Sequence, residues 1–476
     1  MIRITEAEQQ NRSGINPPIR ILRSPINFVK LSLLAEKRSK RGGMTENLEG
    51  KILNLFEIKP YPCDTIEFNS RPYYEKKMKV ERDGKQFYIC PFQQGFEDFT
   101  TEEHARVVNK EIIVHEKPIF PGQPGADIRL IDNKNPLFDL VCYDTGYRYT
   151  GNVIEDGCFF SIDAKGKDYV LIKTKHHIAT PLHIDYFNIS KLEQIFTKKE
   201  LEKNGARYVL VGSNNAGLPK LVMPPYGVEG EDEQGKIVSI LTYLFEKANP
   251  TLDGRREEMK KFIETLISNA RGYYESIGYL SGASQPHPHG RIISMPLLPP
   301  WIEHSYKSSE ELSKKTKKNV YEMLMRDEWL IVDDGKFAII ANPTPDHSGE
   351  IMLVAKEAHN LTELTDEELW EFSNKRRLAQ TLIDMRYSAL PSNTYTLQTF
   401  GDDIEKYPAT RLIMVFSPRT STKAVLELGT HIDAYTTMPE TVAKDMIYII
   451  DKFGLKRTIS NLFNPFVPEK EKHWFI

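Results

Sequence analysis

One strand–turn–helix pattern occurs twice in this chain, and this repeat constrains the fold more than any other feature. In the first copy, an apolar run at 169–172 leads through a turn into a polar, helix-like stretch from about Ile189. In the second, residues 349–355 form a similar run, followed by a turn and a helix start of the type Thr-x-x-Glu. Two copies of one such unit predict an internally duplicated fold.

A short stretch between the two copies carries two histidines on either side of a proline, His287 and His289. Extended backbone alternates faces with period two, so these side chains are expected to point the same way. Pro288 stiffens the chain and favours extended geometry before it. Gly282 and Ser284, just upstream, would let a ligand approach the backbone closely.

Two chemistries use such a pair of imidazoles. Both rings can bind one metal ion, or one can act as a nucleophile while the other orients it or holds a structural metal. The alternative without chemistry is a proline-rich surface loop that happens to contain two histidines. The small residues before the pair and the Gly-Arg-Ile after it favour a site.

The stretch Gly282-Ala-Ser-Gln-Pro-His-Pro-His-Gly-Arg291 resembles the active-site signature of galactose-1-phosphate uridylyltransferases, in the histidine-triad (HIT) superfamily. The family pattern reads approximately Gly-x-Ser-Asn-Pro-His-Pro-His-Gly-Gln, so Gln285 and Arg291 depart from it. The resemblance extends over roughly residues 87–450. It implies an α+β, duplicated HIT-like fold with antiparallel sheets flanked by helices.

The expected organisation is a basic, flexible extension followed by two domains. The extension covers 1–45 and holds nine Lys or Arg against three Glu; a partner-binding or phosphate-steering arm is its alternative reading. The first HIT-like domain, with the His-Pro-His motif, is expected over 46–315, and a second, degenerate one over 316–476. The pattern of residues 425–453 predicts a helix.

A segment beginning at Cys90 is similar to the family's Cys-Pro-x-Cys zinc knuckle, with Gln93 in place of the second cysteine. Two thiolates on one turn are a strong zinc signal, whereas a lone cysteine is usually a small buried hydrophobe. The resemblance implies a zinc site of Cys90, His287 and His177, with His176 as the alternative to His177, and no organic cofactor. A metal assay on the purified protein tests this expectation.

The family reaction is a two-step nucleotidyl transfer. The second histidine attacks the α-phosphorus of a nucleotide sugar, a sugar phosphate leaves, and another sugar phosphate takes the nucleotide. By resemblance His289 is this nucleophile, so it must be neutral, with Nε2 free and Nδ1–H held by an acceptor. His287 would orient it or bind metal. Arg291 stands where the family has a glutamine, and it carries a fixed charge that can bind phosphate bidentately.

The resemblance also implies substrate-binding residues. Gly282 and Ser284 belong to the motif, and Asn133 follows a strand-like run similar to a family segment near the nucleotide. An asparagine that caps a turn is the ordinary alternative for Asn133. Asn215 ends another strand-like run similar to the family's Asn-x-Gly turn, although counting back from the motif would select Ser276 instead.

The second copy lacks the motif. The family carries a His-x-His on its late strand, whereas this chain has Ile413 and Val415 there. We therefore expect no secondary iron site, a scaffold or dimer role for this half, and a structural role for His359.

Composition excludes other classes of function. The chain is 40% hydrophobic and 27% charged with a net charge of −3, so nothing indicates nucleic-acid binding. No apolar run approaches the roughly 20 residues that span a membrane, and four cysteines without a secretory signal indicate the cytoplasm. The expected partners are a nucleotide sugar, a sugar phosphate and, by resemblance, a second copy in a homodimer.

Two other functions stay open at this stage. A HIT-type hydrolase or phosphorylase would pass the nucleotidyl group to water or phosphate, and a nucleotide-binding relative would not turn over at all. The three functions are distinguished by the acceptor to which His289 passes the nucleotidyl group, or by the absence of any transfer.

Overall fold

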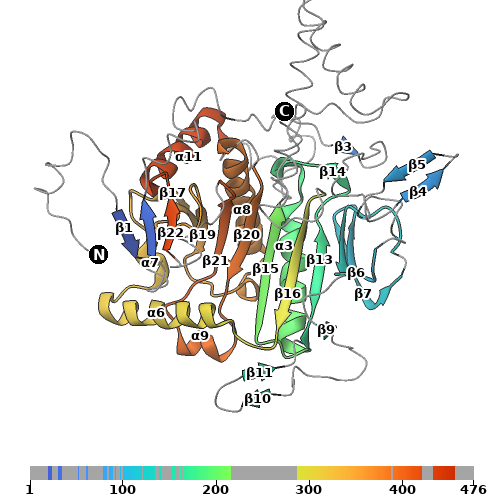
Figure 1. The fold of residues 1–476 in the computed structure, drawn as a ribbon, viewed down its shortest axis with the longest axis horizontal. Helices are drawn as coiled ribbons and strands as arrows, with labels where there is room; N and C mark the ends of the chain where they lie inside the picture. The colour runs from blue at the N-terminus through green and yellow to red at the C-terminus, as the bar shows by residue number, and fades with distance from the viewer. Residues whose placement is uncertain are drawn as a thin grey trace, which may run out of the picture.

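The computed structural model describes most of the chain's two repeated units (Figure 1). The described residues are 100–120, 122–134, 165–215, 287–387, 390–420 and 432–455, with the shorter pieces 20–23, 31–34, 61–62, 79–82, 85–88, 139–140, 153–155 and 160–162, and residues 52, 92 and 97.

In this part of the chain, eleven antiparallel strands form one continuous sheet (Figure 1). Their order from edge to edge is β17-β18-β19-β21-β20-β15-β16-β13-β8-β6-β7. The bounds are β6 (Glu103–Val108), β7 (Glu111–Ile119), β8 (Ile128–Asp132), β13 (Asp168–Ile172), β15 (Tyr208–Asn215), β16 (His289–Met295), β17 (Leu330–Asp334), β18 (Phe337–Ala341), β19 (Ile351–Ala355), β20 (Ser392–Leu397) and β21 (Ile413–Pro418).

The two halves of this sheet repeat one strand order. In the first half it is β6-β8-β13-β16-β15, and in the second it is β17-β18-β19-β21-β20. Each half places a helix between its third strand and its last two, α3 (Tyr186–Glu202) and α8 (Asp366–Arg386). A short 3-10 helix precedes each of them, η7 (Pro181–His183) and η8 (Leu361–Glu363). The predicted duplicated α+β fold is therefore confirmed.

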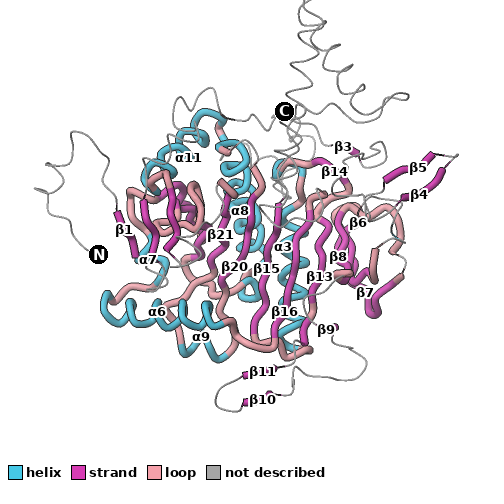
Figure 2. Tube along the Cα trace, in the orientation of Figure 1, coloured by secondary structure: helices cyan, strands magenta, loops and turns pink. Residues whose placement is uncertain are grey.

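Helices α3, α8 and α11 (Pro439–Phe453) pack on one side of the sheet, which we call the helix face; α3 and α8 run along the central strands in Figure 2. Successive residues of a strand point to opposite faces. Tyr169 and Leu171 of β13 belong to the helix-face core, whereas Val170 and Ile172 form a small cluster on the other side. We call that other side the motif face.

The motif face of the second half is closed by two helices, α6 (Pro300–Thr316) and α7 (Val320–Leu324). Val320 and Leu324 of α7 pack against Met352 and Ile413 in a separate apolar cluster. Because helices cover both of its faces, every residue of β19 is buried, as is typical of a fully covered strand.

The halves meet where β15 pairs with β20 and where α3 packs on α8. A buried ion pair links these helices: Arg376 NH1 and NH2 lie 2.5 and 3.0 Å from the two carboxylate oxygens of Glu193. Both side chains are 1% exposed, and the guanidinium stacks over the Tyr186 ring, 5.3 Å from its centroid. A buried charge held this way requires its partner, because desolvation is costly for an unpaired ion.

The helix predicted over 425–453 is wrong in its first part. Ile432–Tyr435 forms strand β22, which pairs in parallel with β2 (Leu31–Leu34), and α11 begins only at Pro439. A proline is favoured in the first turn of a helix, since its fixed φ suits that position and its missing N–H has no partner to lose there.

Short elements complete the described structure. They are β1 (Arg20–Arg23), which pairs with β2, together with the pairs β3 (Tyr61–Pro62) and β14 (His176–Ile178), β4 (Lys79–Arg82) and β5 (Lys85–Tyr88), β9 (Asp139–Leu140) and β12 (Lys165–Gly166), β10 (Val153–Glu155) and β11 (Phe160–Ile162), and the helix α9 (Asp402–Lys406). β1 and β2 fall within the predicted extension 1–45. The predicted domain boundaries stay predictions. Within the described ranges, no helix is both long and apolar enough to cross a membrane.

The contact between α3 and α8 predicts that two glutamates of α3 contribute very differently to the free energy of unfolding. Glu193→Gln leaves Arg376 charged and buried, so we expect the free energy of unfolding to fall by about 3 kcal/mol or more. Glu202→Gln, which removes a partner of Lys198 in a pair that is 62% and 63% exposed, should change it by less than about 0.5 kcal/mol. Urea denaturation measures both, and equal small losses would contradict the role given to the buried pair.

Candidate active site

The His-Pro-His motif begins the central strand of the first half. His289 is the first residue of β16 and lies opposite Ile172 of β13. The residue before it is also tied to β13, because the N–H of Lys173 donates to the Pro288 carbonyl at 3.0 Å. The ladder therefore holds both Pro288 and His289 against β13.

The tautomer of His289 follows from one hydrogen bond. Its Nδ1 lies 2.8 Å from the backbone carbonyl of His287. A carbonyl can only accept, so Nδ1 carries the proton and Nε2 keeps its lone pair. This is the arrangement that the predicted nucleophile requires.

His289 is also held neutral. Its side chain is buried, with 8% exposure. Its pKa is lowered from an ordinary value of 6.5 to about 4, first by burial and then by the charges of Lys173 and Arg291, while the hydrogen bond to His287 opposes the shift. A neutral imidazole is the reactive form of a histidine nucleophile.

His287 has the opposite tautomer. It is fully buried, and its Nε2 lies 2.8 Å from the carbonyl of Thr174, so the proton is on Nε2. The ring of Phe92 contacts both imidazoles, with centroid distances of 6.0 Å to His287 and 5.4 Å to His289. The two rings thus share one side, as the His-x-His spacing predicts.

Arg291 lies on the same face as His289, two residues along β16, and forms an ion pair that the sequence did not reveal. Its Nε donates to Oδ1 of Asp168 at 3.0 Å and its NH2 to Oδ2. Asp168 is fully buried and also accepts a hydrogen bond from Asn133 Nδ2 at 3.0 Å. The carboxylate balances the arginine's charge, while the Arg291 side chain stays 24% exposed.

Two neighbouring asparagines lie on opposite faces of β15. Asn215, the predicted substrate contact, donates from Nδ2 to Gln380 and Ser392 at 3.3 and 3.2 Å, on the helix face. Asn214 points to the motif face. The β15–β16 ladder pairs Gly212 with Arg291, and continuing this register by two residues sets Asn214 beside His289. The alternation of a strand is the signal that could have identified Asn214.

Several predicted residues lie outside the described part of the chain. These are Gly282 and Ser284 of the motif, Cys90 and Gln93 of the segment similar to the zinc knuckle, Ser276, and the side chain of His177. Their roles stay predictions, as do those of Asn133 and Asn215.

Two of the named zinc candidates, His287 and His176, have described side chains. Among the described side chains, no group of three His, Cys, Asp or Glu could hold a metal ion. His287 does have a feature of metal ligands, since one ring nitrogen donates to a backbone carbonyl and so directs the other nitrogen as the ligand atom. Cys90 and the His177 side chain are not described, so zinc stays a prediction.

The second half contains an isoleucine at the position of His289. Ile413 lies opposite Val354 just as His289 lies opposite Ile172. The next N–H also matches, because Ala355 donates to the Leu412 carbonyl as Lys173 does to Pro288. The second copy thus keeps the ladder of the first without its imidazole.

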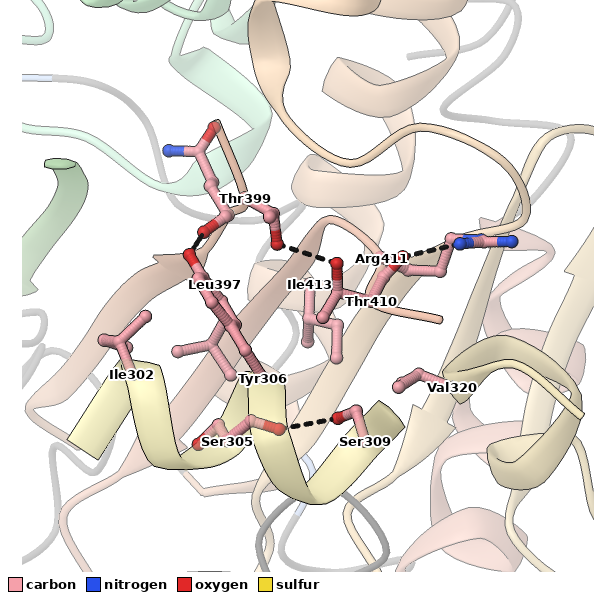
Figure 3. Close-up of a pocket in the computed structure, with 11 residues that line it drawn as sticks. Ile302, Ser305, Tyr306, Ser309, Val320, Leu397, Thr399, Thr410, Arg411 and Ile413 are labelled. Atoms are coloured by element: carbon pink, nitrogen blue, oxygen red, sulfur yellow. Dashed lines mark hydrogen bonds between the residues drawn. The ribbon is translucent and has the colours of Figure 1, made fainter. Parts of the chain in front are cut away.

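Helix α6 fills the space over Ile413. In Figure 3, Tyr306 points from α6 towards the segment of Leu397 and Thr399, and Ser309 bonds back to Ser305. These residues line a cavity of about 20 Å³. Such a cavity has room for about one water molecule. His359, predicted to be structural, lies near it, with Nδ1 3.3 Å from the Thr410 hydroxyl.

The Asp168–Arg291 pair generates a double-variant prediction. Arg291→Gln removes the charged partner of the buried Asp168 carboxylate, so we expect the free energy of unfolding to fall by about 3 kcal/mol. The double variant Asp168→Asn, Arg291→Gln removes both charges and should recover most of this loss.

Urea denaturation measures this cycle. Lys175→Gln, in an ion pair with Asp127 that is 45% and 38% exposed, is the control and should change stability by less than about 1 kcal/mol. If the loss of stability in the double variant equals the sum of the losses in Arg291→Gln and Asp168→Asn, the two residues are not coupled.

Comparison with known proteins gives matches in structure alone. No family model matches the chain, and no curated protein matches it by sequence. An ADP-glucose phosphorylase from Arabidopsis thaliana, solved with bound ADP-glucose, superposes with a TM-score of 0.57 at 15% identity, over 90% of this chain and 98% of that one. A GalT-like protein from the same organism gives 0.53 at 15% identity, over 90% and 99%.

A uridylyltransferase gives a TM-score of 0.50 at 15% identity, over 78% of this chain and 93% of that one. At this identity the similarity concerns the fold. It extends over nearly the full length of the matched chains and agrees with the duplicated sheet described above. The chain therefore shares its fold with the GalT-like protein, the ADP-glucose phosphorylase and the uridylyltransferase.

Proposed function

We propose that this chain is a nucleotidyltransferase that carries a nucleoside monophosphate on His289 between a nucleotide sugar and a sugar 1-phosphate. One observation supports this proposal above the others: Nδ1 of His289 is bound to the His287 carbonyl at 2.8 Å, which leaves the Nε2 lone pair for phosphorus. Buried imidazoles in a structural role do not require this tautomer.

The first step forms one bond and breaks one. The Nε2 lone pair attacks the α-phosphorus, and the bond from that phosphorus to the bridging oxygen breaks. The electron pair leaves with the bridging oxygen as part of the sugar 1-phosphate. The ring now carries phosphorus on Nε2 and a proton on Nδ1, so it is positively charged, and the His287 carbonyl stabilises that charge.

The second step reverses the first with a new acceptor. A phosphate oxygen of the incoming sugar 1-phosphate attacks the same phosphorus, and Nε2 leaves with its electron pair. No proton has to move on His289 in either step, because Nδ1–H remains bound throughout. Arg291, held by Asp168, presents a partly exposed guanidinium on the same face and supports the phosphoryl oxygens.

The similar structures support the substrate class. The Arabidopsis phosphorylase was solved with ADP-glucose bound, and another similar structure is a uridylyltransferase. A nucleotide sugar is thus the donor we propose, with the base and the sugar left open. Zinc binding and a homodimer stay predictions from the sequence.

A phosphorylase is the second candidate. It shares the first step and differs only in its acceptor, which is inorganic phosphate. The fold likeness to an ADP-glucose phosphorylase is the observation that favours it. A hydrolase would discharge the same intermediate to water.

The proposal predicts a covalent nucleotidyl group on His289. Wild-type protein is incubated with ADP-glucose or UDP-glucose labelled at the α-phosphate, and peptide mass spectrometry locates the label. We expect an acid-labile phosphoramidate on His289, and a loss of about 10³-fold or more in labelling rate for His289→Asn. His304→Asn, which changes a histidine of α6 away from the motif, is the control and should label normally.

The acceptor is identified by discharging the labelled protein. Discharge that requires glucose 1-phosphate supports a transferase, and discharge that requires inorganic phosphate supports a phosphorylase. Discharge in buffer without either acceptor supports a hydrolase. Full labelling of His289→Asn, or no labelling of the wild type by any nucleotide sugar, would refute the proposed nucleophile.

A further inference from the structure

Lys173 crosses the sheet beneath the strand that carries the nucleophile. Its backbone N–H donates to the Pro288 carbonyl at 3.0 Å, on the β13 side of β16. Its Nζ donates to Oγ of Ser213 at 2.5 Å, and Ser213 belongs to β15, on the other side of β16. Because side chains alternate along a strand, Lys173, two residues after Leu171, lies on the helix face. The lysine therefore joins the two neighbours of β16 on the face opposite the imidazole of His289.

The residue after the nucleophile makes room for this crossing. A Cβ added to Gly290 would lie 3.2 Å from Cε of Lys173, 3.2 Å from Oγ of Ser213 and 3.0 Å from the carbonyl oxygen of Gly212. These distances are shorter than the optimum for non-bonded atoms, so a side chain at Gly290 would displace the lysine. The glycine thus lets the aliphatic stem of Lys173 lie against the backbone next to His289.

Lys173 is a buried cation whose hydrogen-bond acceptor is an uncharged hydroxyl. Its exposed fraction is 3%, and among the described residues no carboxylate lies within ion-pair distance of it. Burial, and then the charge of Arg376 on α8, lowers the pKa of Lys173 to about 7, while Glu193 of α3 and Asp384 of α8 oppose the shift. Glu193 is already bound to Arg376. Burial raises the pKa of Asp384 to about 7, so this carboxyl balances the lysine only in part.

The charge of Lys173 acts on the ring of His289. Lys173 and Arg291 are the two cations that lower the pKa of this ring, and Arg291 is balanced by Asp168. In the proposed reaction the ring becomes positively charged once phosphorus is bound to Nε2. A positive charge on the other side of the strand raises the free energy of this adduct, because like charges repel strongly where water is excluded. The repulsion is relieved when Nε2 leaves the phosphorus.

We propose that Lys173 is a positioning residue of this site, which supports β16 from the helix face and whose ammonium keeps the nucleotidyl group on His289 ready for transfer to the acceptor. This inference rests on the proposed function for the covalent intermediate. Lys173 lies on the face opposite the reacting Nε2, and no bond or proton changes on it in either step. Its charge sets how easily the bond between phosphorus and nitrogen breaks. A neutral side chain at this position would give a more stable adduct that discharges more slowly.

The yield and the lifetime of the adduct test this role. Wild type and Lys173→Met are labelled with UDP-glucose or ADP-glucose at about pH 6, where a lysine with a pKa of about 7 is protonated. The ratio of donor to glucose 1-phosphate is chosen so that wild type is only partly labelled. We expect the ratio of adduct to free protein to be about 10-fold higher in Lys173→Met, since the repulsion is removed. Discharge by glucose 1-phosphate should be about 10-fold slower, and labelling should be no slower than in wild type.

The direction of these changes separates the role of the charge from a loss of packing. Loss of packing alone would slow labelling and lower the yield, whereas loss of the charge raises the yield. Lys198→Met, which removes a 62% exposed lysine of α3 paired with Glu202, is the control and should change neither quantity. Urea denaturation shows whether each variant is folded. If Lys173→Met is not, Ser213→Ala replaces it: without its acceptor less of the lysine is protonated, so the same changes are expected at a smaller size.

The outcomes distinguish this inference from the proposed function. A wild type that forms no adduct with any nucleotide sugar would refute both. A wild-type adduct whose yield and discharge rate are the same in folded Lys173→Met would overturn the role of Lys173 alone. So would a variant that labels more slowly and to a lower yield, since Lys173 would then serve packing only. In both of these cases His289 would remain the nucleophile.

Discussion

The hydrogen bond from Nδ1–H of His289 to the carbonyl of His287 sets the chemistry that this site can perform. It fixes the proton on one ring nitrogen and so leaves the other as a nucleophile. Pro288, between the two histidines, has a restricted φ, and the N–H of Lys173, on the β13 side, ties its carbonyl to the sheet. The central strand therefore positions one imidazole and selects its tautomer at the same time.

Among the residues described, the second copy of the duplicated fold lacks this site because it has lost the histidine. The ladder of the second half repeats that of the first, with Ile413 opposite Val354 where His289 lies opposite Ile172. With an isoleucine there, α7 packs on the motif face and forms an apolar cluster with Met352 and Ile413. The second half stabilises the first through the buried pair of Arg376 and Glu193 and reaches the site through β20.

The sequence was sufficient for features that depend on local pattern. The strand–turn–helix repeat predicted the duplication, and the period of a strand placed His287 and His289 on one side. The sequence alone was not sufficient to predict contacts between distant segments of the chain. Asp168 is 123 residues from Arg291, and their pairing depends on β13 lying next to β16. This ion pair places a carboxylate against the fixed charge of Arg291 beside His289.

Two further differences have local physical reasons. Asn215 was selected by its likeness to a family turn, but strand alternation turns its side chain to the helix face and Asn214 to the motif face. The pattern over residues 425–453 read as one helix because apolar residues continue through it, whereas Ile432–Tyr435 is a strand that pairs with a segment about 400 residues earlier. Such a parallel pairing has no local signature.

The protonation of His289 is the most direct test of this account. Nitrogen-15 NMR of histidine-labelled protein, assigned with His289→Asn, reports the tautomer and the pKa of each ring. Because burial and two nearby cations lower the pKa to about 4, we predict that His289 is neutral at pH 7 with its proton on Nδ1, and that it becomes protonated only as the pH falls towards 4. His287 should show the opposite tautomer. A proton on Nε2 of His289, or a pKa at or above 6.5, would contradict the account.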